Sequence, residues 1–264
     1  MSCSIPPEIQ DLIIDHLHDE PAALEACYLV SKSWIDRTRK HLFAVVRFTT
    51  FGLDFGLWKK AFPDPAKSPA HHTRTLFIHN PHFTTAPGAD VILAFCSIVR
   101  LDVNTGGYEG VSFVPLHGLS PVITSLHLTV TSLPNLEIFG LVCSLPLLED
   151  LSLFSLDFQR ADESWSTPLS SPRFTGSLEL RVLGGIQSAT RLLLDLPDGL
   201  HFTRIAVRWL YEDDIESTMD LVSRCSDTLE YLGITNFFPG TFPSVPVPNR
   251  QPTATSRRTQ GGVA

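Results

Sequence analysis

One short pattern recurs along most of this chain and limits the possible folds more than any other feature. It consists of an apolar residue, two residues of any type, a second apolar residue, one of any type and a third apolar residue. The central residues of its eight occurrences are Val46, Leu76, Leu101, Leu126, Leu151, Leu178, Ile205 and Leu232. The spacing is 25 residues from 76 to 151 and 27 from 151 to 232, which predicts one structural unit repeated along the chain.

Each occurrence predicts a β-strand, because its second and third apolar places alternate with other residues. Threonine takes the first place twice, at Thr73 and Thr175. Between the strands the sequence predicts helices that begin at Pro134 and at Asp213-Asp214, and a helix or packed loop over 51–62. The chain therefore alternates strands with covering segments, and the apolar side of each strand should face the covering layer.

Units of 25 to 27 residues with strands such as Leu148-x-x-Leu151-x-Leu153 resemble the leucine-rich repeat. The asparagine or cysteine that usually follows the last strand leucine is missing, so the units are degenerate. The resemblance implies an α/β solenoid with a curved parallel sheet, because one unit cannot close its own core and must stack on its neighbours. We expect this array over residues 44–243.

The last part of the sequence departs from this plan. Five prolines between 239 and 252 disfavour a further helix or strand, and we expect a disordered tail over 244–264. Two interpretations of the end of the array stay open. Either the FFPGTF segment at 237–242 covers the last strand, or the chain is a shortened relative of a longer array.

Residues 1–43 follow a helical period instead. Pro6 and Pro7 suit the first turn of a helix, and Ile9, Leu12, Ile13 and Leu17 would share one face of it. A second helix should follow Pro21, and a third should follow Ser31, with Trp34 in the core of the module. The sequence thus predicts three short amphipathic helices before the first strand.

This segment resembles the F-box. The resemblance rests on Ile5-Pro6-Pro7-Glu8-Ile9, which is similar to the Leu-Pro-x-Glu-Leu opening, on Leu29-Val30-Ser31-Lys32-Ser33-Trp34, which is similar to the Val-Ser-Lys-x-Trp signature, and on the closing pair Leu42-Phe43. It covers residues 5–43, with isoleucine in place of leucine at Ile5 and Ile9, and it is nearest to the F-box-like domains abundant in fungi.

The resemblance implies docking on the Skp adaptor, and through it on a cullin, in a Skp–cullin–F-box ubiquitin ligase. Three helices of this size expose more apolar surface than they bury among themselves, which favours a partner. The implied contact residues are Pro6, Pro7, Ile9, Ile13, Leu17, Leu24, Leu29 and Val30. The alternative is that these residues only cap the repeat array. Because Phe43 belongs both to the F-box signature and to the first repeat pattern, we expect no hinge between the third helix and the first strand.

The sequence contains no motif of a common enzyme class: no P-loop, GxGxxG, HExxH or GxSxG. The five cysteines have no metal-binding spacing. From the missing motifs and this spacing together, we expect no catalytic residue, metal or cofactor. A net charge of −8 disfavours nucleic acid as a partner. The apolar stretch 133–156 is interrupted by prolines and acids and does not predict a membrane span. These features favour a cytoplasmic or nuclear location.

Residues between the apolar places of each strand should point away from the core. The candidates for contact with a captured protein are Phe77, Arg100, His127, Asp150, Glu179, Arg204 and Arg208. Charges of both signs with few aromatics suit a protein or peptide partner. The favoured interpretation is a substrate-recognition subunit of the ligase. The alternative is an interaction scaffold of F-box-like origin that does not recruit the ligase.

Overall fold

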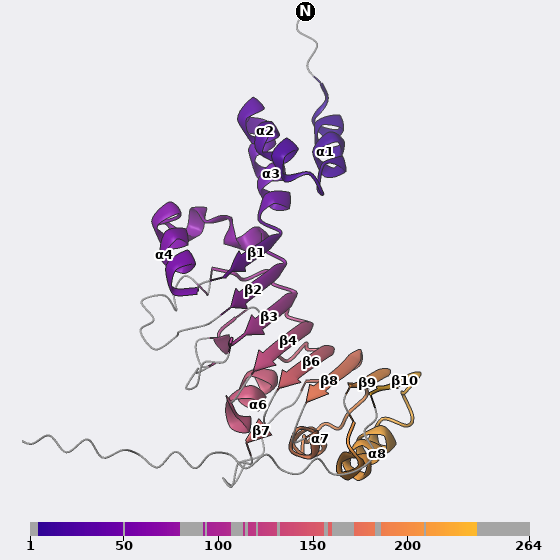
Figure 1. Cartoon of the computed structure of the whole chain (residues 1–264). Helices are drawn as coiled ribbons and strands as arrows, with labels where there is room; N and C mark the ends of the chain where they lie inside the picture. The colour runs from indigo at the N-terminus through magenta and orange to yellow at the C-terminus, as the bar shows by residue number, and fades with distance from the viewer. Residues whose placement is uncertain are drawn as a thin grey trace, which may run out of the picture.

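The computed structural model describes residues 5–49, 51–79, 92, 94–106, 113, 116–119, 121–130, 133–155, 158–159, 172–182, 186–208 and 210–236. Its main feature is a sheet of eight parallel strands, so the fold is α/β (Figure 1). In sheet order the strands are β1 (Val45–Phe48), β2 (Thr75–His79), β3 (Arg100–Asn104), β4 (Ser125–Val130), β6 (Asp150–Ser155), β8 (Ser177–Val182), β9 (Arg204–Arg208) and β10 (Tyr231–Thr235). The predicted tail 244–264 and the FFPGTF segment lie outside the described residues.

Every occurrence of the repeated pattern forms one of these eight strands, which confirms the strand prediction. Equivalent residues pair across the whole sheet, as in Leu76 with Leu101 and Leu101 with Leu126. The central residues from Val46 to Ile205 are at most 8% exposed. Leu232 is 41% exposed, because β10 is the last described strand and no described unit packs over its inner side.

Helices cover one side of the sheet. In chain order the helices are α1 (Pro7–His16), α2 (Pro21–Val30), α3 (Ile35–Leu42), α4 (Phe51–Ala61), α6 (Asn135–Cys143), α7 (Ile186–Leu194) and α8 (Ile215–Arg224). In Figure 1, α4, α6, α7 and α8 lie on the same side of the strands. The predicted helix at Pro134 begins one residue later, and the one at Asp213-Asp214 begins with a 3-10 turn, η6 (Glu212–Asp214). None of the described helices is long and apolar enough to cross a membrane.

Short elements fill the connections. The further 3-10 turns are η1 (Lys32–Trp34), η2 (Pro65–Lys67) and η3 (Pro69–His72), and β5 (Leu133–Pro134) and β7 (Phe158–Gln159) form a small parallel pair. Backbone bonds tie successive units together: the amides of Glu149 and Asp150 both donate to the carbonyl of Thr124, each at 2.9 Å. The apolar side chains of all units thereby form one continuous core.

The first place of one repeat differs from the sequence prediction. Thr73 is fully buried as expected, but Thr175 is exposed, and the preceding Phe174 occupies the core in its place. Phe174 has a left-handed φ of 44°, and its ring packs against Phe202 with centroids 4.9 Å apart. A large aromatic side chain buries more apolar area than a threonine, which offsets the cost of the unfavourable backbone.

No hinge separates the helical module from the sheet, as the sequence predicted. Only Phe43 and Ala44 lie between α3 and β1. The amide of Phe43 donates to Arg39 at 2.9 Å, and the carbonyl of Ala44 accepts from Arg74 and Thr75 at 2.9 and 3.0 Å. The Phe43 ring packs edge-on against Trp58 of α4. Both connecting residues are therefore fixed by the units on either side.

Candidate functional site

The three N-terminal helices share a small interior. Ile14 of α1 is fully buried, and Leu24 and Cys27 of α2 are buried with it, as is Thr38 of α3. Ile14 is the one described residue of α1 that is fully withdrawn from solvent. The side of α1 predicted from its apolar period is therefore the outer side, and a single isoleucine supplies the inward contact.

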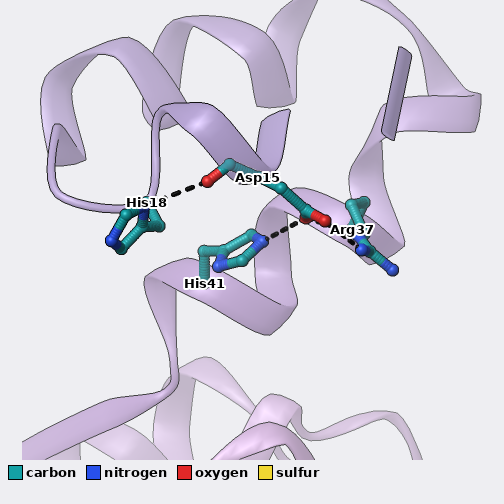
Figure 2. Close-up of polar contacts among 4 residues, drawn as sticks. All are labelled: Asp15, His18, Arg37 and His41. Atoms are coloured by element: carbon teal, nitrogen blue, oxygen red, sulfur yellow. Dashed lines mark hydrogen bonds and ion pairs between the residues drawn. The ribbon is translucent and has the colours of Figure 1, made fainter. Parts of the chain in front are cut away.

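A polar cluster supplies much of the remaining attachment of α1 to α3 (Figure 2). The Asp15 carboxylate accepts from Arg37 Nε at 2.6 Å, from a second guanidinium nitrogen of Arg37, and from His41 Nε2 at 2.7 Å. His18 Nδ1 lies 3.0 Å from the Asp15 carbonyl oxygen. Hydrogen bonds from Arg37, and then from His41, hold the pKa of Asp15 well below its usual range.

A second polar contact joins α1 to the η1 turn that follows α2. Gln10 Oε1 accepts from Trp34 Nε1 at 2.7 Å and from Ser33 Oγ at 3.3 Å. Ser31 caps the intervening turn through its hydroxyl, which accepts from the Ser33 amide. Trp34 is half-buried in this position, which agrees with its predicted role inside the module.

The outer side of the module is strongly apolar. The large exposed apolar residues here are Ile5, Ile9, Leu12, Ile13, Leu29 and Val30, with exposures between 40% and 83%. Of the predicted contacts, Pro6, Pro7, Ile9, Ile13, Leu29 and Val30 are exposed and Leu17 is half-buried. Leu24 is the correction: it is 1% exposed and packs inside the module, so it offers no surface to a partner. Leu12, absent from the predicted set, is 63% exposed and its helical period with Ile9 and Ile13 could have identified it.

The side of the sheet away from the helices, the open face, carries all seven residues predicted to contact a captured protein. The strand register sorts them into rows across the sheet. Phe77, His127 and Glu179 share one row with Asp102 and Ser152. Arg100, Asp150 and Arg204 belong to the row before it, and Arg208 to the row after it. No side chain among the seven is buried.

Charged side chains from β8 and β9 meet on the open face, toward the β10 end of the sheet. Glu179 Oε1 accepts from Arg181 at 2.7 and 2.8 Å and lies 3.1 Å from Arg208. Ser152 Oγ donates to the other carboxylate oxygen at 3.4 Å. Arg181 was not among the predicted contacts, although it occupies the same alternating position as Arg208 one strand away.

Beside this cluster lies a hollow of about 300 Å³. Its lining includes Asp102, His127, Thr129, Ser152, Phe154 and Arg181. Desolvation lowers the pKa of His127, and the neighbouring charges add smaller effects: Arg100 and Arg181 lower the pKa while Asp102 and Glu179 raise it. At neutral pH the imidazole in this hollow is therefore uncharged, with one nitrogen free to donate and one to accept.

Two arginines cover two of the aromatic residues of the open face. Arg47 lies over the ring of Phe77 at 3.8 Å from its centroid, and Arg204 lies 5.1 Å from that of Tyr231. Guanidinium groups thus shield these two rings, whereas Phe154 lines the hollow. Among the described residues, no group of three histidine, cysteine or acidic side chains could hold a metal ion.

No protein-family model matches the chain, and no curated protein matches it. The two surfaces described above, the apolar outer side of the helical module and the charged open face, are consequently the basis for a functional assignment. Both consist of groups suited to binding: apolar side chains without a covering layer at one end, and clustered charges over the sheet.

Proposed function

We propose that this protein is a substrate-recognition subunit of a Skp–cullin–F-box ubiquitin ligase. The N-terminal helices would be an F-box-like module that binds the Skp adaptor, and the strands and helices after it a curved, leucine-rich-repeat-like solenoid that binds a target protein. The observation that carries the proposal is the exposure of Ile9, Leu12 and Ile13 on α1, in a segment whose sequence resembles the F-box.

Several features of the module support docking over capping. If its apolar residues capped the repeats, they would be buried against β1 or α4. Instead, α3 contacts the η3 turn and continues into β1, while the apolar residues of α1 remain in solvent. Each Å² of apolar surface removed from water contributes about 25 cal/mol, so a partner that covers this patch gains substantially. Leu29 of α2, at 83% exposure, is a further uncovered apolar side chain of the module.

The equal spacing of the units supports the solenoid. Strands repeat every 25 or 27 residues and pair residue for residue, with helices on one side only among the described elements. Such units, stacked in chain order, leave one sheet surface available along the whole array. This surface is where we place the captured target, and the candidate contacts lie there.

The proposed mechanism requires no chemistry from this chain. Binding the adaptor at one end and the target along the open face makes ubiquitin transfer, performed by other subunits, effectively intramolecular. The two-residue connection through Phe43 and Ala44 supports this mechanism, since a fixed connection keeps the bound target in one place relative to the adaptor. A protein in this role acts in the cytoplasm or the nucleus.

The direct test is binding of the purified full-length chain to purified Skp adaptor, measured by titration calorimetry. Ile9→Asp and Leu29→Asp should each weaken binding about tenfold or more, because each would place a charge in an apolar interface. Leu147→Asp is the matched control: Leu147 is 51% exposed, and it lies far along the chain, between α6 and β6. This control should bind like the wild type.

Two results would contradict the proposal. One is a wild-type chain that is folded, by circular dichroism, but does not bind the adaptor. The other is binding that Ile9→Asp and Leu29→Asp leave unchanged. Either outcome would favour the alternative of a scaffold that holds proteins without recruiting the ligase. Immunoprecipitation of the chain under proteasome inhibition would then identify the proteins it holds.

A further inference from the structure

The open face has the opposite charge balance from the protein as a whole. The chain carries a net charge of −8. On the outward positions of the eight strands, five arginines (Arg47, Arg100, Arg181, Arg204 and Arg208) outnumber three acidic residues (Asp102, Asp150 and Glu179). A positive surface attracts acidic partners.

Part of the excess positive charge lies in one cluster of ion pairs. Arg181 and Arg208 both bind one oxygen of Glu179, so a single carboxylate faces two guanidinium groups. Asp150, the nearest acid in the neighbouring strand, accepts instead from the Ser177 amide at 2.7 Å and from its hydroxyl at 2.6 Å. Among the described residues, the pair of arginines therefore retains about one uncompensated positive charge and several free donor hydrogens.

The groups around this pair suit a second carboxylate. Arg208 is 46% and Arg181 35% exposed, so both can turn an edge of the guanidinium toward a ligand. The hydroxyl of Thr129 and the neutral imidazole of His127 line the adjacent hollow and can donate hydrogen bonds. Planar guanidinium groups can bind carboxylates through two parallel hydrogen bonds. In the free protein, two nitrogens of Arg181 instead bind the same oxygen of Glu179.

A nucleic acid would fit this surface poorly. Asp102, Asp150 and Glu179 are interspersed among the arginines and would repel a continuous phosphate backbone. Two of the aromatic rings on this face, Phe77 and Tyr231, are covered by Arg47 and Arg204 and are less available for base stacking. A phosphoryl group carries nearly two negative charges and would lie close to Glu179, whereas a carboxylate carries one. These features favour an acidic amino-acid side chain.

We propose that the open face binds an acidic peptide segment, with an aspartate or glutamate of the partner on Arg181 and Arg208 beside the hollow at His127. The inference rests on the proposed function for the role of the open face as the capture surface. It adds the chemical class of the captured segment. In the free protein Glu179 occupies part of this site and competes with the incoming carboxylate.

The test uses fluorescence anisotropy of the full-length chain with a fluorescein-labelled peptide of glutamate and alanine. Peptides with glutamine, lysine or phosphoserine in place of glutamate, and a single-stranded oligothymidylate, are measured in parallel. We expect the glutamate peptide to bind tightest and to weaken as salt rises. Arg208→Gln and Arg181→Gln should each weaken it about threefold to tenfold. Glu179→Gln should strengthen it several-fold, because the competing carboxylate is removed.

Arg224→Gln is the matched control, since Arg224 is an exposed arginine in the last turn of α8, on the helical side. Equal weakening by Arg224→Gln would show attraction to net charge alone and overturn the proposal. Preference for the lysine or phosphoserine peptide, or for oligothymidylate, would also overturn it, as would weaker binding by Glu179→Gln. Adaptor binding is measured on the same samples: if it persists while the glutamate peptide fails, this inference falls and the docking proposal stands.

Discussion

The attachment of α1 to the rest of the module depends on Asp15, and the Asp15→Asn substitution tests how much. Asparagine has nearly the same shape, so packing around Ile14 is preserved while the negative charge is removed. The carboxylate now receives two hydrogen bonds from Arg37 and one from His41, whereas the amide oxygen can keep part of this set without the ionic attraction.

The exposure of the three side chains determines how much free energy the Asp15→Asn substitution should cost. Asp15 is 34%, Arg37 31% and His41 20% exposed, so solvent screens the charges substantially. A well-formed pair at this exposure contributes about 1 kcal/mol, and the histidine hydrogen bond adds about 0.5 kcal/mol. The substitution should therefore cost about 1.5 kcal/mol, equivalent to about a tenfold rise in the population of detached α1.

Native-state hydrogen exchange measures this opening directly. Backbone amides in the second half of α1 should lose about tenfold of their protection, while amides of β3 and β4 should keep theirs. The pH dependence has a defined sign. Because the folded-state pKa of Asp15 is lowered, its contribution is complete above the usual pKa of about 4 and disappears as the pH falls below it. The difference between the two proteins should thus be present above about pH 5 and shrink in stronger acid.

Asp11→Asn serves as the control, one turn earlier on the same helix and exposed, with Arg37 only as a distant attraction. It should change α1 protection much less than Asp15→Asn. Unchanged protection in Asp15→Asn would refute the reasoning that the cluster holds α1. An equal loss in the sheet would refute the view that α1 can detach alone.

Three further predictions concern the sheet. Gly176→Ala should destabilise the protein by about 1 to 3 kcal/mol in chemical denaturation, because the new Cβ would lie 2.5 Å from Asp150 Oδ1; Gly140→Ala, with 3.5 Å of clearance to His117, should be neutral or better. Phe174→Ala should cost about 3 to 5 kcal/mol through the cavity left beside Phe202, and a loss below 1 kcal/mol would contradict its place in the core. Because the folded-state pKa of His127 is lowered, the wild type should lose stability relative to His127→Asn as the pH falls from 7 to 5, and parallel pH profiles would contradict this.

The strands could be predicted because every unit repeats the same alternation, so eight weak local signals support one another. The error at Thr175 arose where two core candidates are adjacent in sequence. Pattern spacing favoured the threonine, whereas the larger Phe174 gains more by burial and accepts a left-handed backbone to reach the core. Only the packing against Phe202 decides between them.

In the helical module, prediction from the sequence failed for a different reason. In α1 three consecutive apolar residues, Leu12 to Ile14, leave the helical period unable to say which side faces inward. The structure turns Ile14 inside and leaves Leu12 and Ile13 outside. On α2, Leu24 is inside although the family resemblance implied a contact. The contact of Arg208 with Glu179 likewise could not be predicted from the neighbouring sequence, because only the pairing register of β8 and β9 brings the two residues together.

The residue-for-residue register of the sheet also sets a regular spacing, which can be compared with the repeat length of a helix or an extended chain laid across the strands. Adjacent strands repeat at about 4.8 Å, and a turn of α-helix advances about 5.4 Å, so a helix laid across the strands stays nearly commensurate with them. The mismatch of about 0.6 Å per step reaches half a strand spacing only after about four strands. In an extended chain, side chains on the same side recur about every 6.6 to 6.8 Å, so they fall out of register with the strands after one or two strands. The strand spacing of the open face is thus nearly equal to the pitch of an α-helix over about four strands, half the width of the sheet.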